Sequence, residues 1–531
     1  MAEAAVPPAD PLDTVAAATP EAVAVVVDPG AGALPTTLTY GELHARVNQL
    51  VNGLREHVRP GERLVWCGPN SLEVLTVIHA ARKLGAVAVP LSYRFSAEEM
   101  AYVIDNADAT CVIADAEYAP LAAAGMAECP KVRSWIGYAA TVDAPALPDG
   151  FTDWEAVVAG QPIDVLPTDD VGGPSGAQMI YTSGTTGKPK GAMRSANDPT
   201  LLATMLAELN YLHADGVHLT TGPLYHSGPL AFATVAGYLG HTVVVMRRFD
   251  APTWIRLVRE HRVTSTFTAP TQLKRIVSLP DDVLAQADLS TMVTLIANAA
   301  PVPYALKQEV IAKLGDGFLY EVYGSTELGV DCILKPEDQL RKPGSCGRPY
   351  GGIEVRIFDE EGGEAPTGTP GELFLRTTMA MDGYHRSSEQ LAEHDEPSGG
   401  EWKSVGDIAY VDDEGYVHIC DRKKDMIISG GMNIYPAEIE AVLHSHPDVL
   451  DVAVFGIPSD EWGDSVHAVV QAKPGVSLDL DALAAHAAEH LGSYKRPRSY
   501  EIRDELPRTD SGKLLKRVLR DEHWKDRGTA V

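Results

Sequence analysis

The run YTSGTTGKPKG, residues 181–191, has the composition of a phosphate-binding loop. Its glycines let backbone N–H groups approach a ligand closely, its threonines add hydroxyl donors and its lysines add positive charge. It is not a Walker A loop, because only two residues separate Gly184 from Gly187 and Pro189 follows Lys188. A proline there has no N–H and disfavours the start of a helix, so the run is either another kind of phosphate-binding loop or a surface turn.

Two further stretches carry side chains suited to a nucleotide and its metal. In EVYGSTELG, Thr326 offers a hydroxyl and Glu327 a carboxylate that suits a hard cation such as Mg²⁺, although a helix cap beside an acid would look similar. In SVGDIAYVDDEGYVHICDRKKD, Asp407 could accept hydrogen bonds from two ribose hydroxyls and Arg422 could donate to the sugar or a phosphate. The alternative for this pair is exposed charges at strand ends.

Near the C-terminus, two segments have simple alternative interpretations. Gly430 and Gly431 in ISGGMNIYPAEIE predict a turn before a helix, which occurs in many proteins. Lys513 in LPRTDSGKLLKR follows a glycine, and this segment could be only a solvated basic tail.

The size and charge of the chain limit what it can do. With 531 residues, it exceeds what one hydrophobic core usually serves, so at least two domains are expected. Its formal charge of −29 disfavours nucleic acid or an anionic membrane as a partner. An anion such as ATP would therefore need locally concentrated lysine, arginine or metal.

The six cysteines include no C-x-x-C pair, which argues against a cysteine zinc site or redox motif and favours free thiols in a reducing compartment. The first twenty residues lack the basic and apolar regions of a signal peptide, and no apolar run is long enough to span a bilayer. We therefore predict a cytoplasmic protein without an integral membrane segment, with a flexible N-terminal extension over residues 1–35.

Helices and short apolar strands alternate over the first half of the chain. Leu43, Val47 and Leu50 fall on one face of a predicted helix at 40–54, and Thr39 with Glu42 has the spacing of a capping box. Apolar strands are expected in RLVWCG (63–68), AVAVP (86–90) and TCVIA (110–114). This alternation predicts an α/β domain with a largely parallel sheet.

After about residue 340 the pattern changes to strands joined by turns. Beyond the DRKKD run follow a helix with Pro436 in its first turn, the strand VLDVAVFGI and an amphipathic helix in LDLDALAAHAAEHL. The predicted fold is thus α/β: a large N-terminal domain of α/β layers over residues 36–423 with an added β-rich subdomain, and a small α+β C-terminal domain over residues 424–531.

Taken in order, these stretches resemble the acyl-adenylate-forming superfamily, which includes acyl-CoA synthetases, adenylation domains of non-ribosomal peptide synthetases and beetle luciferases. The resemblance runs from about Thr39 to Lys516 and includes the YTSGTTGKPKG run, YGSTE, the SVGD and DRKKD pair and the terminal lysine of SGK. Arg194-Ser195 and Met432 depart from patterns common in that superfamily, which weakens the transfer of substrate detail.

The resemblance implies a role for each matching residue. Thr326 would bond the α-phosphate, Glu327 would hold Mg²⁺, Lys513 would reach the α-phosphate and the substrate carboxylate, and His226 would lie beside the acyl pocket. Tyr323 would stack on adenine, and Asp407 and Arg422 would hold the ribose. The loop that binds the β- and γ-phosphates would comprise Thr182, Ser183, Gly184, Thr185, Thr186, Gly187 and Lys190. The adenine side of the site would be formed by Asn298, Ala299, Ala300 and Pro301.

The resemblance also implies a mobile C-terminal domain that rotates about Lys424. One orientation would deliver Lys513 to the nucleotide. The other would withdraw it and present Ser429, Gly430 and Gly431, where glycine leaves room for the pantetheine arm of coenzyme A.

The leading hypothesis is an enzyme that uses ATP and Mg²⁺ to activate a hydrophobic carboxylic acid as acyl-AMP, releases pyrophosphate and transfers the acyl group to coenzyme A. Residues 211–234 would form much of the acyl pocket. An aryl acid, transfer to a carrier-protein thiol, and a catalytically silent nucleotide-binding regulator stay open as alternatives. The acid itself and the oligomeric state, including a homodimer, are not fixed by the sequence.

Overall fold

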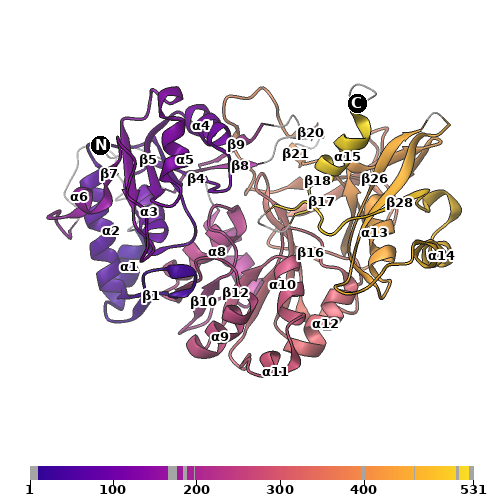
Figure 1. Ribbon diagram of the computed structural model, residues 1–531, viewed down its shortest axis with the longest axis horizontal. Coiled ribbons are helices and arrows are strands. Elements are labelled where there is room, and N and C mark those ends of the chain that lie inside the picture. The colour runs from indigo at the N-terminus through magenta and orange to yellow at the C-terminus, as the bar shows by residue number, and fades with distance from the viewer. Residues whose placement is uncertain are drawn as a thin grey trace.

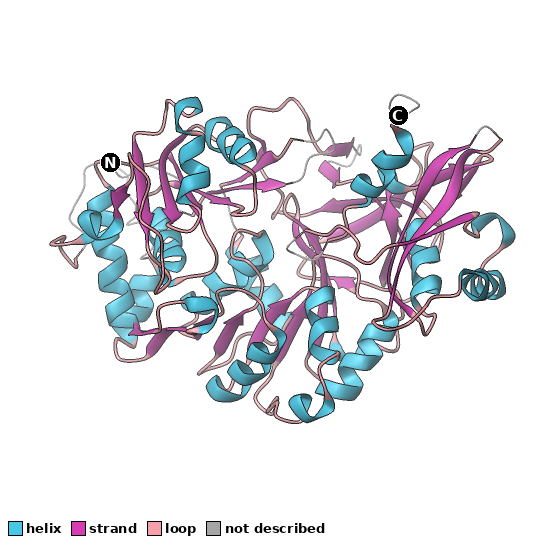
Figure 2. Cartoon of the chain, viewed as in Figure 1, coloured by secondary structure: helices cyan, strands magenta, loops and turns pink. Residues whose placement is uncertain are grey.

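The computed structural model describes residues 10–164, 176–182, 188–195, 198–395, 401–459, 461–509 and 513–525. Two large sheets and a smaller antiparallel sheet form a large N-terminal part, and a fourth sheet lies in a small C-terminal domain (Figures 1 and 2). This mixed architecture confirms the predicted fold class.

The two large sheets of the described chain are mainly parallel in their centres. In spatial order, the nine-stranded sheet contains β16 (Arg348–Pro349), β15 (Gly329–Leu334), β14 (Leu319–Ser325), β13 (Thr294–Ala297), β12 (Ser265–Thr268), β10 (Val217–Thr220), β11 (Thr242–Val245), β1 (Val23–Val27) and β2 (Thr36–Thr39). The eight-stranded sheet contains β19 (Gly383–Tyr384), β9 (Lys190–Arg194), β8 (Gln178–Thr182), β4 (Val87–Leu91), β3 (Arg63–Cys67), β5 (Ala109–Asp115), β6 (Ser134–Tyr138) and β7 (Thr152–Asp153).

Most described strands between residues 354 and 422 form an antiparallel sheet, as their turn-rich sequence predicts. Its members are β17 (Glu354–Phe358), β18 (Gly371–Arg376), β20 (Ala392–Asp395), β21 (Glu401–Ser404), β22 (Asp407–Val411) and β23 (Val417–Arg422). The C-terminal sheet contains β24 (Ile427–Ser429), β25 (Met432–Ile434), β26 (Val449–Ser459), β27 (Gly463–Ala472) and β28 (Ser499–Ile502).

Helices cover these sheets. Those before residue 400 are α1 (Pro11–Ala18), α2 (Tyr40–Leu54), α3 (Leu72–Lys83), α4 (Ala97–Asn106), α5 (Ala119–Ala124), α6 (Trp154–Val158), α7 (Pro199–Glu208), α8 (Ser227–Tyr238), α9 (Ala251–His261), α10 (Pro270–Val277), α11 (Asp281–Leu284) and α12 (Tyr304–Leu314). The C-terminal domain adds α13 (Pro436–His444), α14 (Leu480–His490) and α15 (Lys516–Trp524). Among the described residues, no helix combines the length and apolar character needed to cross a bilayer.

Local sequence signals place several helix ends correctly. The Thr39–Glu42 capping box at the start of α2 is formed in both directions, and a second one, Ser96 with Glu99, begins α4. Gly85, which follows α3, has a φ of +63°, and Pro436 is the first residue of α13.

The N-terminal residues differ from the expectation of a flexible extension over residues 1–35. Helix α1 buries Leu12 completely, and β1 pairs with β11 on one side and β2 on the other. Residues 10–35 are therefore part of the large domain, and only residues 1–9 of the predicted extension lie outside the described chain.

One hydrophobic core lies between the two large sheets and includes residues of α2, α3 and α8. The C-terminal domain has a separate core, which contains Ile427, Ile439, Val454, Val466 and Leu483. A core of its own is what an independently folding domain requires. Figure 1 shows this domain in orange and yellow at one end of the molecule, beside the antiparallel sheet.

Candidate active site

A cavity of about 680 Å³ is lined by both the large domain and the C-terminal domain. The predicted site residues that line it are Thr182, Lys190, His226, Asn298, Ala299, Thr326, Glu327, Arg422, Lys424 and Lys513. Ala300, Pro301, Tyr323, Asp407, Ser429, Gly430 and Gly431 are not among the lining residues. Ser183, Gly184, Thr185, Thr186 and Gly187 of the threonine-rich loop lie outside the described residues.

Thr326 and Glu327 lie in the tight turn that joins β14 to β15. A Cβ on Gly324 would come within 2.0 Å of the Gly329 carbonyl oxygen, so the close approach of the two strands requires glycine there. The helix-cap alternative is wrong for this stretch, because the turn connects two antiparallel strands. The hairpin holds the hydroxyl and the carboxylate at the cavity wall.

Hydrogen bonds from other elements orient this turn. Oε1 of Glu327 accepts from Thr182 Oγ1 at 3.2 Å and from the Tyr384 hydroxyl at 2.9 Å. The Thr326 hydroxyl lies 3.2 Å from Ser227 Oγ at the start of α8. Four segments distant in the sequence are thus joined at one polar end of the cavity.

Arg194 on β9 completes this polar end and was not predicted as a site residue. Its Nη2 donates to the Thr326 carbonyl oxygen at 2.8 Å, and burial lowers the pKa of the guanidinium. The sequence signal that could have pointed to Arg194 is that Arg194-Ser195 departs from the pattern common in the superfamily. For Tyr384, in the two-residue strand β19, neither residue type nor spacing gave any signal.

Asp407 and Arg422 face each other across the β22–β23 pair, in register. Arg422 Nε lies 2.5 Å from Asp407 Oδ1, and the Tyr323 hydroxyl donates to Oδ2, also over 2.5 Å. Asp407 is only 3% exposed, so the alternative of an exposed strand-end charge is wrong for it. Burial and the Asp407 charge raise the pKa of Tyr323, which keeps the phenol protonated as a donor.

Lys513 reaches the cavity from the C-terminal domain, close to Arg422 and Lys424. Its backbone N–H donates to Thr509 Oγ1 at 3.1 Å, and the Thr509 N–H donates to the Lys513 carbonyl oxygen at 2.8 Å. A solvated tail would not be held in this way, so the basic-tail alternative does not fit. The residue as a whole is exposed, but desolvation of its amino group at the cavity, followed by repulsion from Arg422 and Lys424, lowers the pKa of Lys513 to about 8.

His226 immediately precedes α8 and lines the cavity. Burial lowers its pKa to about 4, so the imidazole is neutral at pH 7. Its Nε2 is shielded from solvent and has no protein hydrogen-bond partner. The side chain can therefore offer one neutral polar atom to a ligand beside Ser227.

The predicted adenine-side segment follows β13. Asn298 Nδ2 donates to the Val322 carbonyl oxygen at 2.5 Å, and Ala299 adopts a left-handed φ of +76°. Pro301 is exposed outside the cavity. In this arrangement only the first half of the segment, Asn298 and Ala299, faces the cavity.

Gly430 and Gly431 form the turn of the β24–β25 hairpin, with φ values of +59° and +78°. Two consecutive positive φ angles are typical of a tight hairpin turn and explain the glycine pair. The Gly430 N–H donates to the Trp462 carbonyl oxygen at 2.8 Å. This turn and the preceding Ser429, which is buried, lie on the C-terminal domain outside the cavity that holds Lys513.

The cavity continues from the polar end along α8. Side chains on one stripe of this helix line it, from Ser227 through Ala231 and Thr234 to Tyr238. Apolar side chains complete this arm: Phe232 and Val235 come from α8 itself, and Ile78, Leu202, Met205 and Phe267 come from other elements. A polar end with cations and a carboxylate therefore leads into an apolar arm.

Comparison with known proteins agrees with this geometry. Residues 12–385 match the family described as AMP-binding enzyme, and residues 438–513 match the AMP-binding enzyme C-terminal domain. The chain belongs to the AMP-binding enzyme family. The superfamily inferred from the sequence motifs is thereby confirmed.

Two similar proteins are a feruloyl-CoA synthase from Amycolatopsis sp and the fatty acid–[acyl-carrier-protein] ligase ScoC from Streptomyces coeruleorubidus. The first is 36% identical over 489 residues, covering 91% of this chain and 94% of that protein. The second is 32% identical over 507 residues, covering 93% of each.

A similar solved structure is the anthranilate CoA ligase AuaEII in complex with anthranoyl-AMP. It superposes with a TM-score of 0.84 at 25% identity and covers 97% of both chains. With the family match, these relatives make this AMP-binding enzyme an ATP-dependent, AMP-forming acid–thiol ligase.

Proposed function

We propose that this enzyme joins an extended hydrophobic carboxylic acid to coenzyme A through an acyl-adenylate. The observation that supports this choice is the continuous cavity, which connects Lys513, Thr326 and Glu327 to the apolar arm along α8. The carboxylate would lie at the polar end and the hydrophobic part of the acid in the arm.

The length of the arm favours an extended acid. Ser227 and Tyr238 are eleven residues apart on α8, which corresponds to about 16 Å along a helix that rises 1.5 Å per residue. Thr234 donates its hydroxyl to the Leu230 carbonyl oxygen at 2.7 Å, so its polar group is already satisfied within the helix. At the far end the Arg82 guanidinium lies over the Tyr238 ring and is paired with Asp10.

At the polar end, the obstacle to reaction is the approach of a carboxylate to the negatively charged α-phosphate. Catalysis therefore rests on positioned cations and donors more than on covalent chemistry. Lys513 and Arg422 supply positive charge, and the Thr326 hydroxyl supplies a donor. The neutral imidazole of His226 adds a polar atom beside the substrate carboxylate. Because it is uncharged, it does not form an ion pair with that carboxylate.

Glu327 suits the predicted Mg²⁺ site, because a carboxylate is a preferred ligand of this hard cation. The hydrogen bonds from Thr182 and Tyr384 to Oε1 fix its orientation towards the cavity. Bound there, Mg²⁺ would neutralise phosphate charge. The threonine-rich loop between Thr182 and Lys190 is proposed to hold the outer phosphates.

The nucleoside would be bound by the remaining predicted residues. Asp407 and Arg422 would hold the ribose, with Tyr323 and the segment from Asn298 to Pro301 at the base. Because both Asp407 oxygens already have protein partners, ribose binding requires the carboxylate to exchange or share the bonds from Tyr323 and Arg422.

The thioester step is proposed to use a second orientation of the C-terminal domain, reached by rotation about Lys424. The supporting observation is that Lys513 lines the cavity while the Gly430–Gly431 turn does not. Rotation would withdraw Lys513 from the cavity and bring the Gly430–Gly431 turn to it. The glycine turn would then leave room for the pantetheine arm of coenzyme A.

The acid class is tested by measuring coenzyme A thioester formation with straight-chain acids of increasing length, together with aryl acids. Thr234→Phe fills the arm part-way along α8 and should lower kcat/KM for long acids by about 10²-fold while changing it only a few-fold for short ones. Thr234→Val, which keeps the shape, is the matched control and should resemble the native enzyme. An equal loss for all lengths in Thr234→Phe would contradict the placement of the acid.

Aryl acids are the second candidate class, favoured by the rings of Phe232 and Phe267 in the cavity wall and by the feruloyl-CoA synthase relative. The relative ScoC raises a carrier-protein thiol as the acceptor. The charge of −29 disfavours an acidic carrier as partner. Parallel assays with coenzyme A and a phosphopantetheinylated carrier protein distinguish the two acceptors.

A further inference from the structure

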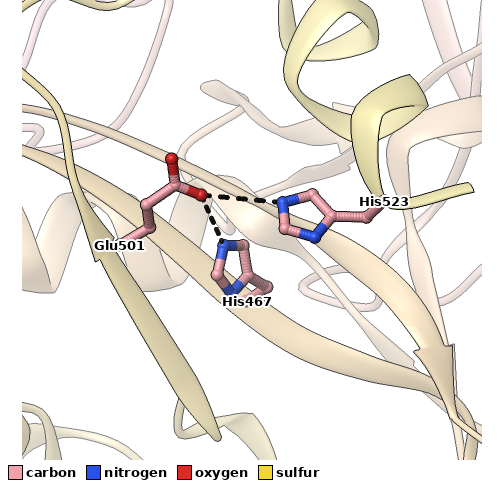
Figure 3. A group of neighbouring side chains, drawn as sticks. All are labelled: His467, Glu501 and His523. Atoms are coloured by element: carbon pink, nitrogen blue, oxygen red, sulfur yellow. Dashed lines mark ion pairs between the residues drawn. The ribbon is translucent and has the colours of Figure 1, made fainter.

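Three potential metal ligands meet in the C-terminal domain, outside the ligase cavity. His467 comes from β27, Glu501 from β28 and His523 from α15 (Figure 3). Oε2 of Glu501 lies 3.8 Å from Nε2 of His467 and 3.7 Å from Nε2 of His523. One ligand atom from each residue lies within 4.8 Å of the other two.

The two imidazole nitrogens that face Glu501 form no hydrogen bond and lie only at ion-pair distance from its carboxylate. Nε2 of His467 and Nε2 of His523 are both shielded from solvent and have no hydrogen-bond partner, and His467 as a whole is only 4% exposed. Their separations from Glu501 are too long for hydrogen bonds. Buried polar atoms are normally satisfied, so two such nitrogens aimed at one carboxylate point to a missing ligand.

Neighbouring groups hold all three side chains in position. Nδ1 of His467 lies 2.7 Å from Ser499 Oγ, which fixes the ring and leaves Nε2 facing the group. Arg503 donates to Oε1 of Glu501 at 2.5 Å, so Oε2 stays available. Outer hydrogen bonds of this kind orient the ligands in metal sites.

We propose that His467, Glu501 and His523 bind a divalent transition-metal ion, with Zn²⁺ as the best match. Two imidazoles and a carboxylate suit zinc, whereas Mg²⁺ and Ca²⁺ prefer oxygen ligands. Tetrahedral Zn²⁺ places its ligand atoms about 3.4 Å apart, so small side-chain movements from the observed separations close the site. A water molecule would fill the fourth position from the partly exposed side of Glu501 and His523.

The ion would fasten α15 to the C-terminal sheet. This helix begins three residues after Lys513, so the metal site lies on the element that follows the proposed catalytic lysine. The site is separate from the ligase cavity and does not depend on the proposed function. Its role would be structural, limiting the movement of the helix relative to β27 and β28.

The proposal is tested with tag-free, full-length protein made metal-free with a chelator. Titration with ZnCl₂, followed by calorimetry, should show one ion bound per chain and a rise in Tm, and Co²⁺ should give the visible absorption of a tetrahedral site. Glu501→Gln and His523→Gln should each weaken Zn²⁺ binding at least about tenfold, since loss of even an outer partner costs that much.

His486→Gln and His490→Gln are matched controls in the same domain, because these two histidines contact each other but hydrogen-bond to backbone carbonyl oxygens. They should bind Zn²⁺ like the native chain. Circular dichroism of each variant without metal checks that it is folded. Absence of a bound ion in the native chain, or equal binding in the Glu501 and His523 variants, would overturn the proposal.

Discussion

Lys513 shares the polar end of the cavity with Arg422 and Lys424, and desolvation of its amino group together with this repulsion lowers its pKa to about 8. The lysine is therefore mostly charged below that pH and mostly neutral above it. Because the proposed role is to meet negative charge on the carboxylate and the α-phosphate, the neutral form should be inactive. In the absence of substrate, the fraction of charged Lys513 thus falls as the pH rises through about 8.

We accordingly expect kcat/KM for acyl-adenylate formation, measured by ATP–pyrophosphate exchange, to fall above about pH 8, because this parameter reports the free enzyme. Lys513→Arg keeps a charge that does not titrate in this range, so the fall should disappear even if the rate is lower. Lys513→Ala should lower the rate by about 10²–10³-fold at all pH values. A pH profile that is the same in the native and Lys513→Arg enzymes would contradict this assignment.

At this scale, residue type and order in the sequence predicted which side chains gather at the cavity, including Thr326, Glu327 and Lys513. Their roles stay predictions. The hydrogen-bond partners of these side chains were harder to predict from the sequence. Tyr384 contacts Glu327 only because β19 pairs with β9, and such long-range strand pairing leaves no local mark in the sequence.

Among the secondary-structure elements, α15 depends on an ion-pair network at its first residue. Lys516 Nζ lies 2.8 Å from Glu440 on α13 and 3.9 Å from Asp421 on β23. Burial raises the pKa of both carboxyl groups, and the charge of Lys516 opposes this rise, so the lysine favours their charged forms. The network joins the helix that follows Lys513 to two other elements.

Lys516→Met should leave these carboxylates without their cation and destabilise the C-terminal domain by about 3 kcal/mol. Denaturant unfolding followed by far-UV circular dichroism would measure the change. Arg517→Met is the matched control, because Arg517 is exposed on the next position of the same helix and should change stability little. Equal stability of the native and Lys516→Met proteins would show that the network contributes nothing net.

Elements with strong local signals were predictable, whereas the first strand was not. The Thr39–Glu42 capping box placed the start of α2 because this signal acts within one helical turn. Strand β1 lies between β2 and β11, and the partner in β11 is more than two hundred residues away. The alanine- and proline-rich start of the chain gave no indication of that pairing, so residues 10–35 were wrongly predicted to be flexible.

For the whole molecule, the arrangement of the two domains determines which C-terminal residues reach the nucleotide. Lys424 lies in a single 3-10 turn, Lys423–Asp425, between the antiparallel sheet and the C-terminal domain. Lys424→Pro fixes the φ angle of the backbone within this turn and should hinder rotation of the C-terminal domain about this residue. The change thus acts on the backbone at the proposed hinge.

We expect Lys424→Pro to keep ATP–pyrophosphate exchange within a few-fold of the native enzyme and to slow transfer from preformed acyl-adenylate to coenzyme A by about 10²-fold or more, as expected when a required conformational step is blocked. Lys424→Ala removes the same charge from the cavity but leaves the backbone free, so it separates the electrostatic effect from the hinge effect. If Lys424→Pro and Lys424→Ala support both half-reactions equally, rotation does not occur at this residue. If Lys424→Pro instead loses exchange, the observed domain arrangement is not the one that forms the adenylate.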